Sequence, residues 1–293
     1  MKKKDNTPAL IRVTRWLYPR LERWAPSVAD RIFRLVFYVP VSYRVPDKEK
    51  EAAASAYKFQ IEVTGKKIQG YSWGDTSKPY VLLVHGWAGR ATQFRKFIEP
   101  LNTAGFRVIG ADGPAHGQSE GRRTSILEFE SMLHALFRKF GEPTAVITHS
   151  FGGAAVLYSV MHGLPVKTLV NIASPTHEDE ILKTYLRAIN GSWPSAERFK
   201  KFVVKATGKT FHEFTAIYAV QHLKDPIHLM MVHDEEDRDV VIHQAEEFIK
   251  VYPSARLYRT SGLGHTRILK DEQVIREVVG FIEHHAVTVP SVH

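Results

Sequence analysis

Short apolar segments alternate with segments of helical periodicity along most of the chain, and this alternation limits the fold more strongly than any other feature. The apolar segments resemble buried strands and lie at residues 80–84, 106–111, 145–148, 167–172, 227–232 and 255–259. Helical spacing occurs at residues 92–104, 125–140, 241–251, 271–284 and directly after Ser150. Strands that alternate with helices predict a mostly parallel sheet with helices on both faces. A hairpin of residues 57–63 and 67–73 precedes this pattern.

Two regions depart from the alternation and define the expected domain organisation. Residues 1–50 carry apolar positions at helical spacing on both sides of Pro26, which predicts an extension of two short amphipathic helices. After a charged hinge at residues 47–51, we expect residues 51–293 to form one large domain. Within it, residues 175–225 contain helical patterns without strands, which predicts a small inserted helical cap.

The composition excludes several kinds of protein. A chain of 293 residues with 44% hydrophobic content can bury a large core, but no apolar run approaches the roughly 18 residues of a membrane span. The chain has no cysteine, which excludes disulfides, thiolate metal ligands and a cysteine nucleophile. Charged residues follow Lys2, Lys3 and Lys4 where a signal peptide would be apolar, so we expect no cleaved signal and a cytoplasmic location.

The positive charge is concentrated at the N-terminus. The net charge is +9, and the first 50 residues hold 12 Lys and Arg against 5 Asp and Glu. Basic amphipathic helices with aromatic residues suit the surface of an anionic membrane. The alternative is that their apolar faces pack on the rest of the protein or form a homodimer, which is the more common outcome. No recognition motif accompanies the charge, so we do not expect nucleic-acid binding.

Ser150 occupies the most informative position in the chain. It follows the apolar run at residues 145–148 and precedes Phe151 and Gly152, where a helix begins. A sharp bend from strand to helix would expose its hydroxyl and direct the first amides of the helix at the space before it, as a nucleophile requires. A serine here would also serve as an ordinary helix N-cap.

Five segments in chain order resemble the α/β-hydrolase family. The family motif G-x-S-x-G corresponds to Thr148-His149-Ser150-Phe151-Gly152, and the other segments are residues 85–89, residues 112–119, Asp237 and Gly264-His265. The resemblance covers roughly residues 57–285. It implies an α/β-hydrolase fold, a serine nucleophile, and an acid and a histidine that follow the serine in the sequence.

A serine hydroxyl needs a base to take its proton, and an imidazole suits this task. The family resemblance selects His265, which lies on a glycine-rich loop after the last strand. It likewise selects Asp237 as the acid that orients the imidazole, with Asp234 and Asp239 as alternatives. A metal site in this acidic, histidine-flanked loop is the minor alternative. We expect His149 to be structural.

The resemblance also implies an oxyanion hole formed by the amides of Trp87 and Phe151. Residues 112–119 are interpreted as a structural loop. One position departs from the family motif: Thr148 replaces the first glycine, and a β-branched side chain is expected to crowd the contact between strand and helix.

These features predict a serine hydrolase that cleaves a small-molecule carboxylic ester through an acyl-enzyme and needs neither a metal nor a cofactor. A dehalogenase or an epoxide hydrolase is disfavoured because its nucleophile would be an aspartate. Amidase or peptidase activity is left open, with the acidic run Glu178-Asp179-Glu180 as a hint of an amine site. The alternative without enzyme activity is a protein that docks on a membrane or a partner through its N-terminal helices.

Overall fold

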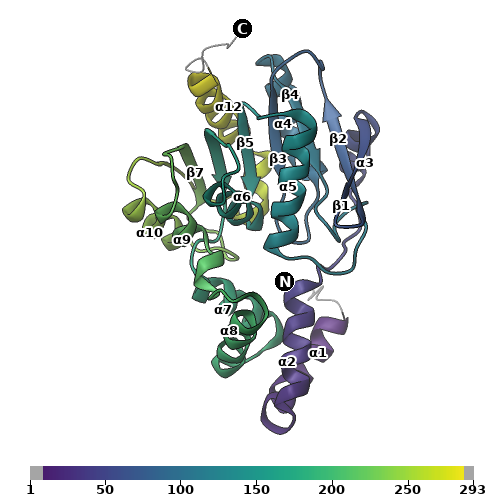
Figure 1. The fold of residues 1–293 in the computed structure, drawn as a ribbon, viewed down its shortest axis with the longest axis vertical. Coiled ribbons are helices and arrows are strands. Elements are labelled where there is room, and N and C mark those ends of the chain that lie inside the picture. Colours follow the sequence, from purple (N-terminus) through teal and green to yellow (C-terminus); the bar gives the residue numbers. More distant parts are fainter. Residues whose placement is uncertain (1–8, 287–293) are drawn as a thin grey trace. The chain divides into compact units, whose positions relative to one another are not determined.

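The computed structural model describes residues 9–286, with side chains from residue 12 onward (Figure 1). Lys2, Lys3, Lys4 and His293 lie outside the described residues. The chain forms two units: the first comprises Met1–Val39 and His177–Glu213, and the second comprises Pro40–Thr176 and Phe214–His293. The expected division at residue 50, with a cap inserted in the larger domain, stays a prediction.

The second unit contains an eight-stranded sheet in the order β1-β2-β4-β3-β5-β6-β7-β8. The first three strands pair antiparallel, and all later neighbours pair parallel, as the strand and helix alternation predicts. The strands are β1 (Tyr57–Val63), β2 (Lys66–Trp73), β3 (Tyr80–Val84), β4 (Arg107–Ala111), β5 (Ala145–His149), β6 (Thr168–Ile172), β7 (His228–Asp234) and β8 (Arg256–Thr260).

Helices cover both faces of this sheet. One apolar core lies between the sheet and helices α5 (Ile126–Phe140), α6 (Phe151–Met161), α9 (Ala216–Gln221) and α10 (His243–Val251). The other lies between the sheet and helices α4 (Arg95–Thr103) and α12 (Glu272–Ala286). Along β3, Leu82 and Val84 belong to the first core and Val81 and Leu83 to the second. Because both faces are covered, the strand is apolar throughout, as its sequence indicates.

The stretch expected to be a charged hinge is instead a helix, α3 (Asp47–Ala54). Glu49 is buried in it and forms an ion pair with Arg90, with 2.9 Å between Oε2 and Nη1. The Thr92 hydroxyl donates to the same carboxylate oxygen at 3.2 Å. A buried, paired carboxylate fixes the segment in place, so its charge does not mark a solvent-exposed hinge.

The described residues of the first unit form four helices: α1 (Ala9–Trp24), α2 (Pro26–Tyr38), α7 (Glu178–Ile189) and α8 (Trp193–Thr207). The two expected N-terminal helices therefore form, and they pack on the expected cap helices. The Tyr18 hydroxyl donates to the Ser195 hydroxyl at 2.8 Å, and Arg198 pairs with Asp30 at 2.7 Å. Phe199 lies against Phe33 and Phe37, with ring centroids 5.0 and 4.5 Å apart.

The third helix expected in the cap belongs to the second unit. Within residues 211–223 the structure has a short 3-10 turn and then α9. Ala216 and Ala219 of α9 are buried in the same core as Ala155 of α6. Among residues 9–286, no helix has the length and apolar character needed to cross a bilayer.

The aromatic core of the first unit gives a test of how the N-terminal helices are held. Replacing Phe199 by alanine removes its contacts with Phe33 and Phe37 and should weaken this packing by about 3 kcal/mol. Hydrogen exchange over residues 12–38 should accelerate in Phe199→Ala, whereas the exposed Val204→Ala on the same helix should leave it unchanged. Unchanged protection of α1 and α2 in Phe199→Ala would show that these helices do not depend on α8.

Candidate active site

Ser150 lies at the bend between β5 and α6, as predicted. Its backbone has φ +52° and ψ −126°, a conformation that side-chain-bearing residues rarely adopt. Although Ser150 occupies the N-cap position, its side chain makes no capping hydrogen bond. The hydroxyl instead lies 3.1 Å from His265 Nε2. The simple helix-cap interpretation therefore does not account for this serine.

The bend requires close approach of several backbone segments. A Cβ atom on Gly86 would lie 2.7 Å from the Cβ of Ser150. A Cβ on Gly152 would lie 2.5 Å from the Val84 carbonyl oxygen, and one on Gly153 would lie 2.1 Å from Asn171 Oδ1. Because real Cβ atoms do not approach so closely, these glycines let β3, β6 and the start of α6 converge on Ser150.

Asp237 is linked to His265, and His265 is linked to Ser150. His265 lies in the short helix α11 (Gly264–Arg267) after β8, and its Nδ1 is 2.8 Å from Asp237 Oδ2. The other Asp237 oxygen accepts hydrogen bonds from the amides of Asp239 and Val240 at 2.8 and 3.0 Å. The structure thus brings the three residues predicted from the sequence into one hydrogen-bonded chain.

The charge state of Asp237 suits an acceptor for the imidazole. Burial raises the pKa of its carboxyl, but the hydrogen bond and charge of His265 and the two main-chain amides outweigh burial. The pKa of Asp237 therefore lies below its ordinary value. The group is a carboxylate at neutral pH and holds Nδ1 of His265 as the hydrogen-bond donor.

The two alternative acids, Asp234 and Asp239, have hydrogen-bond partners other than the imidazole of His265. Asp234 Oδ2 accepts from the Thr260 hydroxyl at 2.7 Å and from the Leu263 amide at 3.0 Å. It therefore ties the end of β7 to the loop that carries His265. Asp239 is exposed, and its amide supports Asp237. The sequence does not reveal this role of Asp234, because Thr260 and Leu263 lie more than 25 residues away from it.

The metal alternative involves Asp237 and His265 together with Asp239. Asp237, Asp239 and His265 each offer a ligand atom within 4.8 Å of the others. However, His265 Nδ1 and Asp237 Oδ2 are already joined by a hydrogen bond. A metal ion bound to these atoms would have to replace that bond, so the grouping fits an acid and imidazole pair better.

Trp87 and Phe151 lie on the two segments that meet at Ser150. Phe151 is the first residue of α6, so its amide belongs to the helix turn without intrahelical acceptors. Trp87 follows Gly86, and its ring packs edge-on against Phe151, with centroids 5.7 Å apart. The next residue, Ala88, has φ +56°, and its amide donates to His116 Nε2 at 3.0 Å. The loop is thereby fixed beside the start of the helix.

Buried histidines hold the surrounding backbone. His85 Nε2 accepts from the Gly113 amide at 2.7 Å, and His149 Nε2 donates to the carbonyl oxygen of His265 at 2.8 Å. Burial lowers the pKa of His85 to about 4 and the pKa values of His116 and His149 to about 3. These imidazoles are therefore neutral at pH 7. His149 is structural, as expected, and its partner is the backbone of His265.

Thr148 stands at the motif position that is glycine in the family. Its side chain is fully buried, and its hydroxyl donates to the Val170 carbonyl oxygen at 3.1 Å and to the Asn171 side chain. Both partners belong to β6, the strand beside β5. The Thr148 hydroxyl thus finds its hydrogen-bond partners in the neighbouring strand.

The expected structural loop at residues 112–119 is anchored as well. The Asp112 carboxylate accepts hydrogen bonds from the amides of Ala91 and Gln118.

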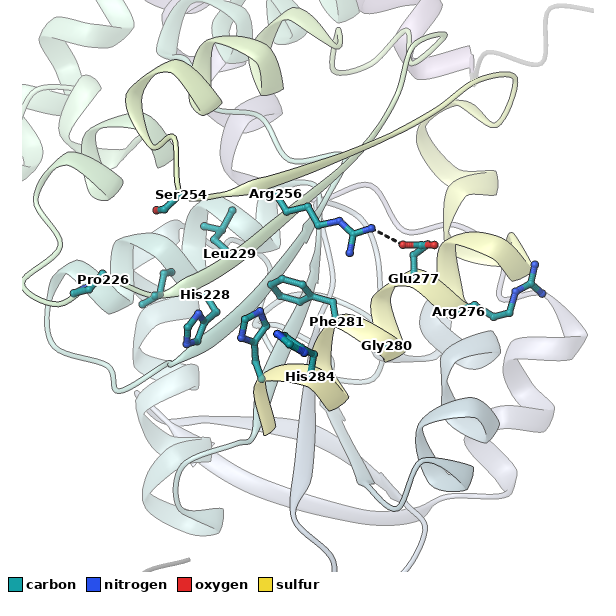
Figure 2. A pocket seen from close by; sticks show the side chains of 12 residues that line it. Pro226, His228, Leu229, Ser254, Arg256, Arg276, Glu277, Gly280, Phe281 and His284 are labelled. Carbon is teal, nitrogen blue, oxygen red and sulfur yellow. Dashed lines mark hydrogen bonds and ion pairs between the residues drawn. The ribbon is translucent and has the colours of Figure 1, made fainter. Parts of the chain in front are cut away.

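A groove of about 910 Å³ lies elsewhere in the second unit (Figure 2). It is lined by the starts of β7 and β8 and by α12, and an ion pair joins Arg256 to Glu277 at 2.6 Å. Ser150 follows the end of β5 and Asp237 the end of β7. The groove therefore lies toward the opposite ends of the parallel strands and is not part of the candidate active site.

Comparison with known proteins identifies the fold family. Residues 79–270 match the model of the alpha/beta hydrolase fold family. A serine hydrolase-like protein of Danio rerio is 25% identical over 150 residues, which cover 46% of this chain and 44% of that protein. A relative from Drosophila melanogaster is matched over 38% of its length. The chain thus spans less than half the length of these curated relatives.

Two solved structures share the fold at low sequence identity. An esterase of Pyrococcus furiosus superposes with a TM-score of 0.64 at 19% identity, over 85% of this chain and 98% of that chain. A carboxylesterase from the thaumarchaeon Nitrososphaera gargenis gives a TM-score of 0.60 at 16% identity, over 80% and 100% of the chains.

The buried neutral histidines predict a loss of stability in acid. Each imidazole is protonated in the unfolded chain below about pH 6.5 but stays neutral in the folded protein until about pH 3 to 4, so the unfolded state binds more protons in this window. Within this pH window, each imidazole should lower the free energy of unfolding by about 1.4 kcal/mol for every unit by which the pH falls. Urea denaturation between about pH 7 and about pH 5 measures this slope.

A matched pair of variants isolates one histidine. His116→Gln should reduce the pH dependence of the unfolding free energy by about one proton, whereas Val204→Ala, which removes no titratable group from an exposed site, should leave it unchanged. An unchanged slope in His116→Gln would mean that His116 takes up its proton equally in both states.

Proposed function

The chain belongs to the α/β-hydrolase fold family, and we propose that it is a serine hydrolase that cleaves carboxylic esters. The observation that carries this proposal is the hydrogen-bonded chain from Asp237 through His265 to a Ser150 hydroxyl that does not cap its helix. The similarity to the serine hydrolase-like protein of Danio rerio supports the hydrolase class, and the two esterases share the fold.

In the first half of the proposed reaction, Ser150 Oγ attacks the ester carbonyl carbon. His265 Nε2 takes the hydroxyl proton as the new C–O bond forms. The carboxylate of Asp237 accepts a hydrogen bond from Nδ1–H of His265 and stabilises the imidazolium without taking its proton. As the tetrahedral intermediate collapses, His265 returns the proton to the leaving alkoxide, and an alcohol departs. Ser150 is left acylated.

The second half repeats these steps with water. His265 Nε2 takes a proton from a water molecule, whose oxygen attacks the acyl carbon. Collapse of the second tetrahedral intermediate breaks the bond to Ser150 Oγ, which recovers its proton from His265. A carboxylic acid is released, and every group returns to its starting state without a metal or an organic cofactor.

The amides of Phe151 and Trp87 would stabilise the oxyanion of both intermediates. The start of α6 adds the favourable end of its dipole. Removal of one such donor typically slows a reaction by about a hundred- to a thousandfold. The contact between the Trp87 and Phe151 rings, and the His116 bond to the Ala88 amide, keep this loop ordered before a substrate arrives.

We favour an ester over an amide or peptide substrate because of the ion pairs made by Glu178, Asp179 and Glu180. The sequence suggests these three acidic residues as a site for a substrate amine. Lys200 pairs with Glu178 and Asp179 at 3.1 and 2.9 Å, and Lys183 pairs with Glu180 at 2.7 Å. These carboxylates already have cationic partners, which weakens them as a site for a substrate amine.

The expected cytoplasmic location is part of the proposal, and fractionation of cells tests it.

Covalent labelling tests the nucleophile. A fluorophosphonate should label the wild-type protein on the peptide that contains Ser150, and the protein should hydrolyse p-nitrophenyl esters. Ser150→Ala should lose the label and about 10⁶-fold of the turnover. Ser174→Ala, which removes a hydroxyl bonded to the Ser150 carbonyl oxygen, is the control and should keep the label. Labelling at another residue, or no labelling of folded protein, would remove the basis for the proposal.

A pair of aspartate variants tests which carboxylate acts on the imidazole. Asp237→Asn should lower kcat by about ten-thousandfold, because an amide cannot stabilise the imidazolium and favours the wrong tautomer. Asp239→Asn keeps the main-chain amide that bonds to Asp237 and should change kcat by less than about threefold. Steady-state rates on p-nitrophenyl acetate measure both. The reverse order of effects would assign the role to Asp239.

A further inference from the structure

Helix α1 leaves an apolar stripe exposed after it has packed in the first unit. Trp24 is 76% exposed, Trp16 61%, Val13 57% and Leu17 36%. At about 100° per residue, these four side chains and Arg20 fall within an arc of about 100° on the helix. We call these five residues the outer stripe. Most exposed apolar residues are scattered singly, whereas these share one helix face.

The opposite side of α1 is the one that packs. Tyr18 is buried and bonds to Ser195, and Glu22 Oε1 accepts from the Ser192 hydroxyl at 2.9 Å. The packing of α1 on the cap helices therefore accounts for the polar and aromatic inner side only. Within the outer stripe, Val13, Trp16 and Trp24 are more than half exposed, and Leu17 is the most covered of the four apolar side chains.

The charged side chains of helices α1 and α2 also differ between the inner side, which packs, and the outer side, which is exposed. Helices α1 and α2 contain six arginines and two acids. Both acidic side chains lie on the inner side. Glu22 accepts hydrogen bonds from serines at the start of α8, and Asp30 pairs with Arg198 at 2.7 Å. Arg20 and Arg23 instead lie over the exposed rings of Trp16 and Trp24, at 4.0 and 4.9 Å from the ring centroids. The outer surface is thus both apolar and cationic.

Helix α2 continues this character. Val28, Arg31 and Leu35 are exposed and occupy positions i, i+3 and i+7, which share one side of a helix. The two helices form a hairpin with a one-residue connection, and they pack side by side within the first unit (Figure 1). Exposed aliphatic residues next to arginines therefore occur on both helices.

We propose that the outer stripe docks the protein on the surface of an anionic phospholipid bilayer. Tryptophan rings settle at the depth of the lipid head groups, and valine and leucine side chains enter the upper acyl region. The arginines remain at the phosphates, where anionic lipid contributes about 1 kcal/mol per basic residue. No described helix is long enough to cross the bilayer, so this contact is peripheral.

Charge argues for a bilayer rather than a second copy of the chain. In a two-fold dimer the same patch would face itself and bring Arg20 and Arg23 close to their symmetry mates. The two acids of the hairpin cannot compensate, because they are bonded to the inner side. An anionic lipid surface neutralises both Arg20 and Arg23, which lie over the exposed tryptophan rings, and covers the apolar side chains as well.

Flotation with vesicles tests the proposal on the full chain. The wild type should float with vesicles of three parts phosphatidylcholine and one part phosphatidylglycerol, and it should bind vesicles of phosphatidylcholine alone about tenfold more weakly. Trp16→Ser with Trp24→Ser should lose about tenfold in binding to the anionic vesicles. Tyr57→Ser, at a 72% exposed aromatic residue of the second unit, is the matched control and should bind like the wild type.

A second variant keeps the test independent of the tryptophans. Arg20→Gln with Arg23→Gln should lose the preference for anionic vesicles while circular dichroism stays that of the wild type. Equal binding of all proteins to anionic vesicles, or no binding by the wild type, would overturn the proposal. A wild-type dimer in sedimentation that becomes a monomer in the tryptophan variant would also overturn it and assign the stripe to a second copy.

Discussion

The backbone at Ser150 has to turn from a strand into a helix within one residue, and the remainder of the site depends on this turn. A residue with a side chain at φ +52° costs about 1 to 3 kcal/mol and persists only where the surroundings hold it. Here β5 is hydrogen-bonded on both sides, and the Ser150 amide donates to the Ile172 carbonyl oxygen at 2.9 Å. Gly86, Gly152 and Gly153 leave the space that this turn needs.

The loops that supply the other groups are held mainly through their backbones. His116 fixes the Ala88 amide, His149 fixes the His265 carbonyl oxygen, and Asp234 joins β7 to the loop before His265. Burial keeps His116 and His149 neutral, so each imidazole can hold one hydrogen bond without carrying a charge. The proposed chemistry then needs only Ser150, His265 and Asp237 to exchange or stabilise protons.

The sequence predicted those parts of the fold and site that local patterns determine. Strand and helix alternation located the parallel sheet, and the order of motifs located Ser150, Asp237 and His265, which the structure brings together. The catalytic roles of these residues stay predictions. Thr148 was expected to crowd the bend, yet its hydroxyl is satisfied by β6, a strand that the local motif does not describe.

Contacts over long sequence separations could not be predicted. The charged stretch at residues 47–51 is a helix that is tied to the sheet domain through Glu49, which pairs with Arg90, 41 residues away. The N-terminal helices pack on α7 and α8 through pairs such as Tyr18 and Ser195, 177 residues apart. Helical periodicity predicted the helices but not their partners, since an apolar face does not specify what will cover it.

Acylation of Ser150 during turnover is the event on which the proposed function rests. Rapid quenching of the wild-type protein with excess p-nitrophenyl acetate, followed by digestion and mass spectrometry, detects it directly. We expect one acetyl group on the peptide that contains Ser150, formed as fast as the first equivalent of p-nitrophenol and lost as substrate is exhausted. Steady hydrolysis with Ser150 unmodified at every time would contradict the acyl-enzyme pathway.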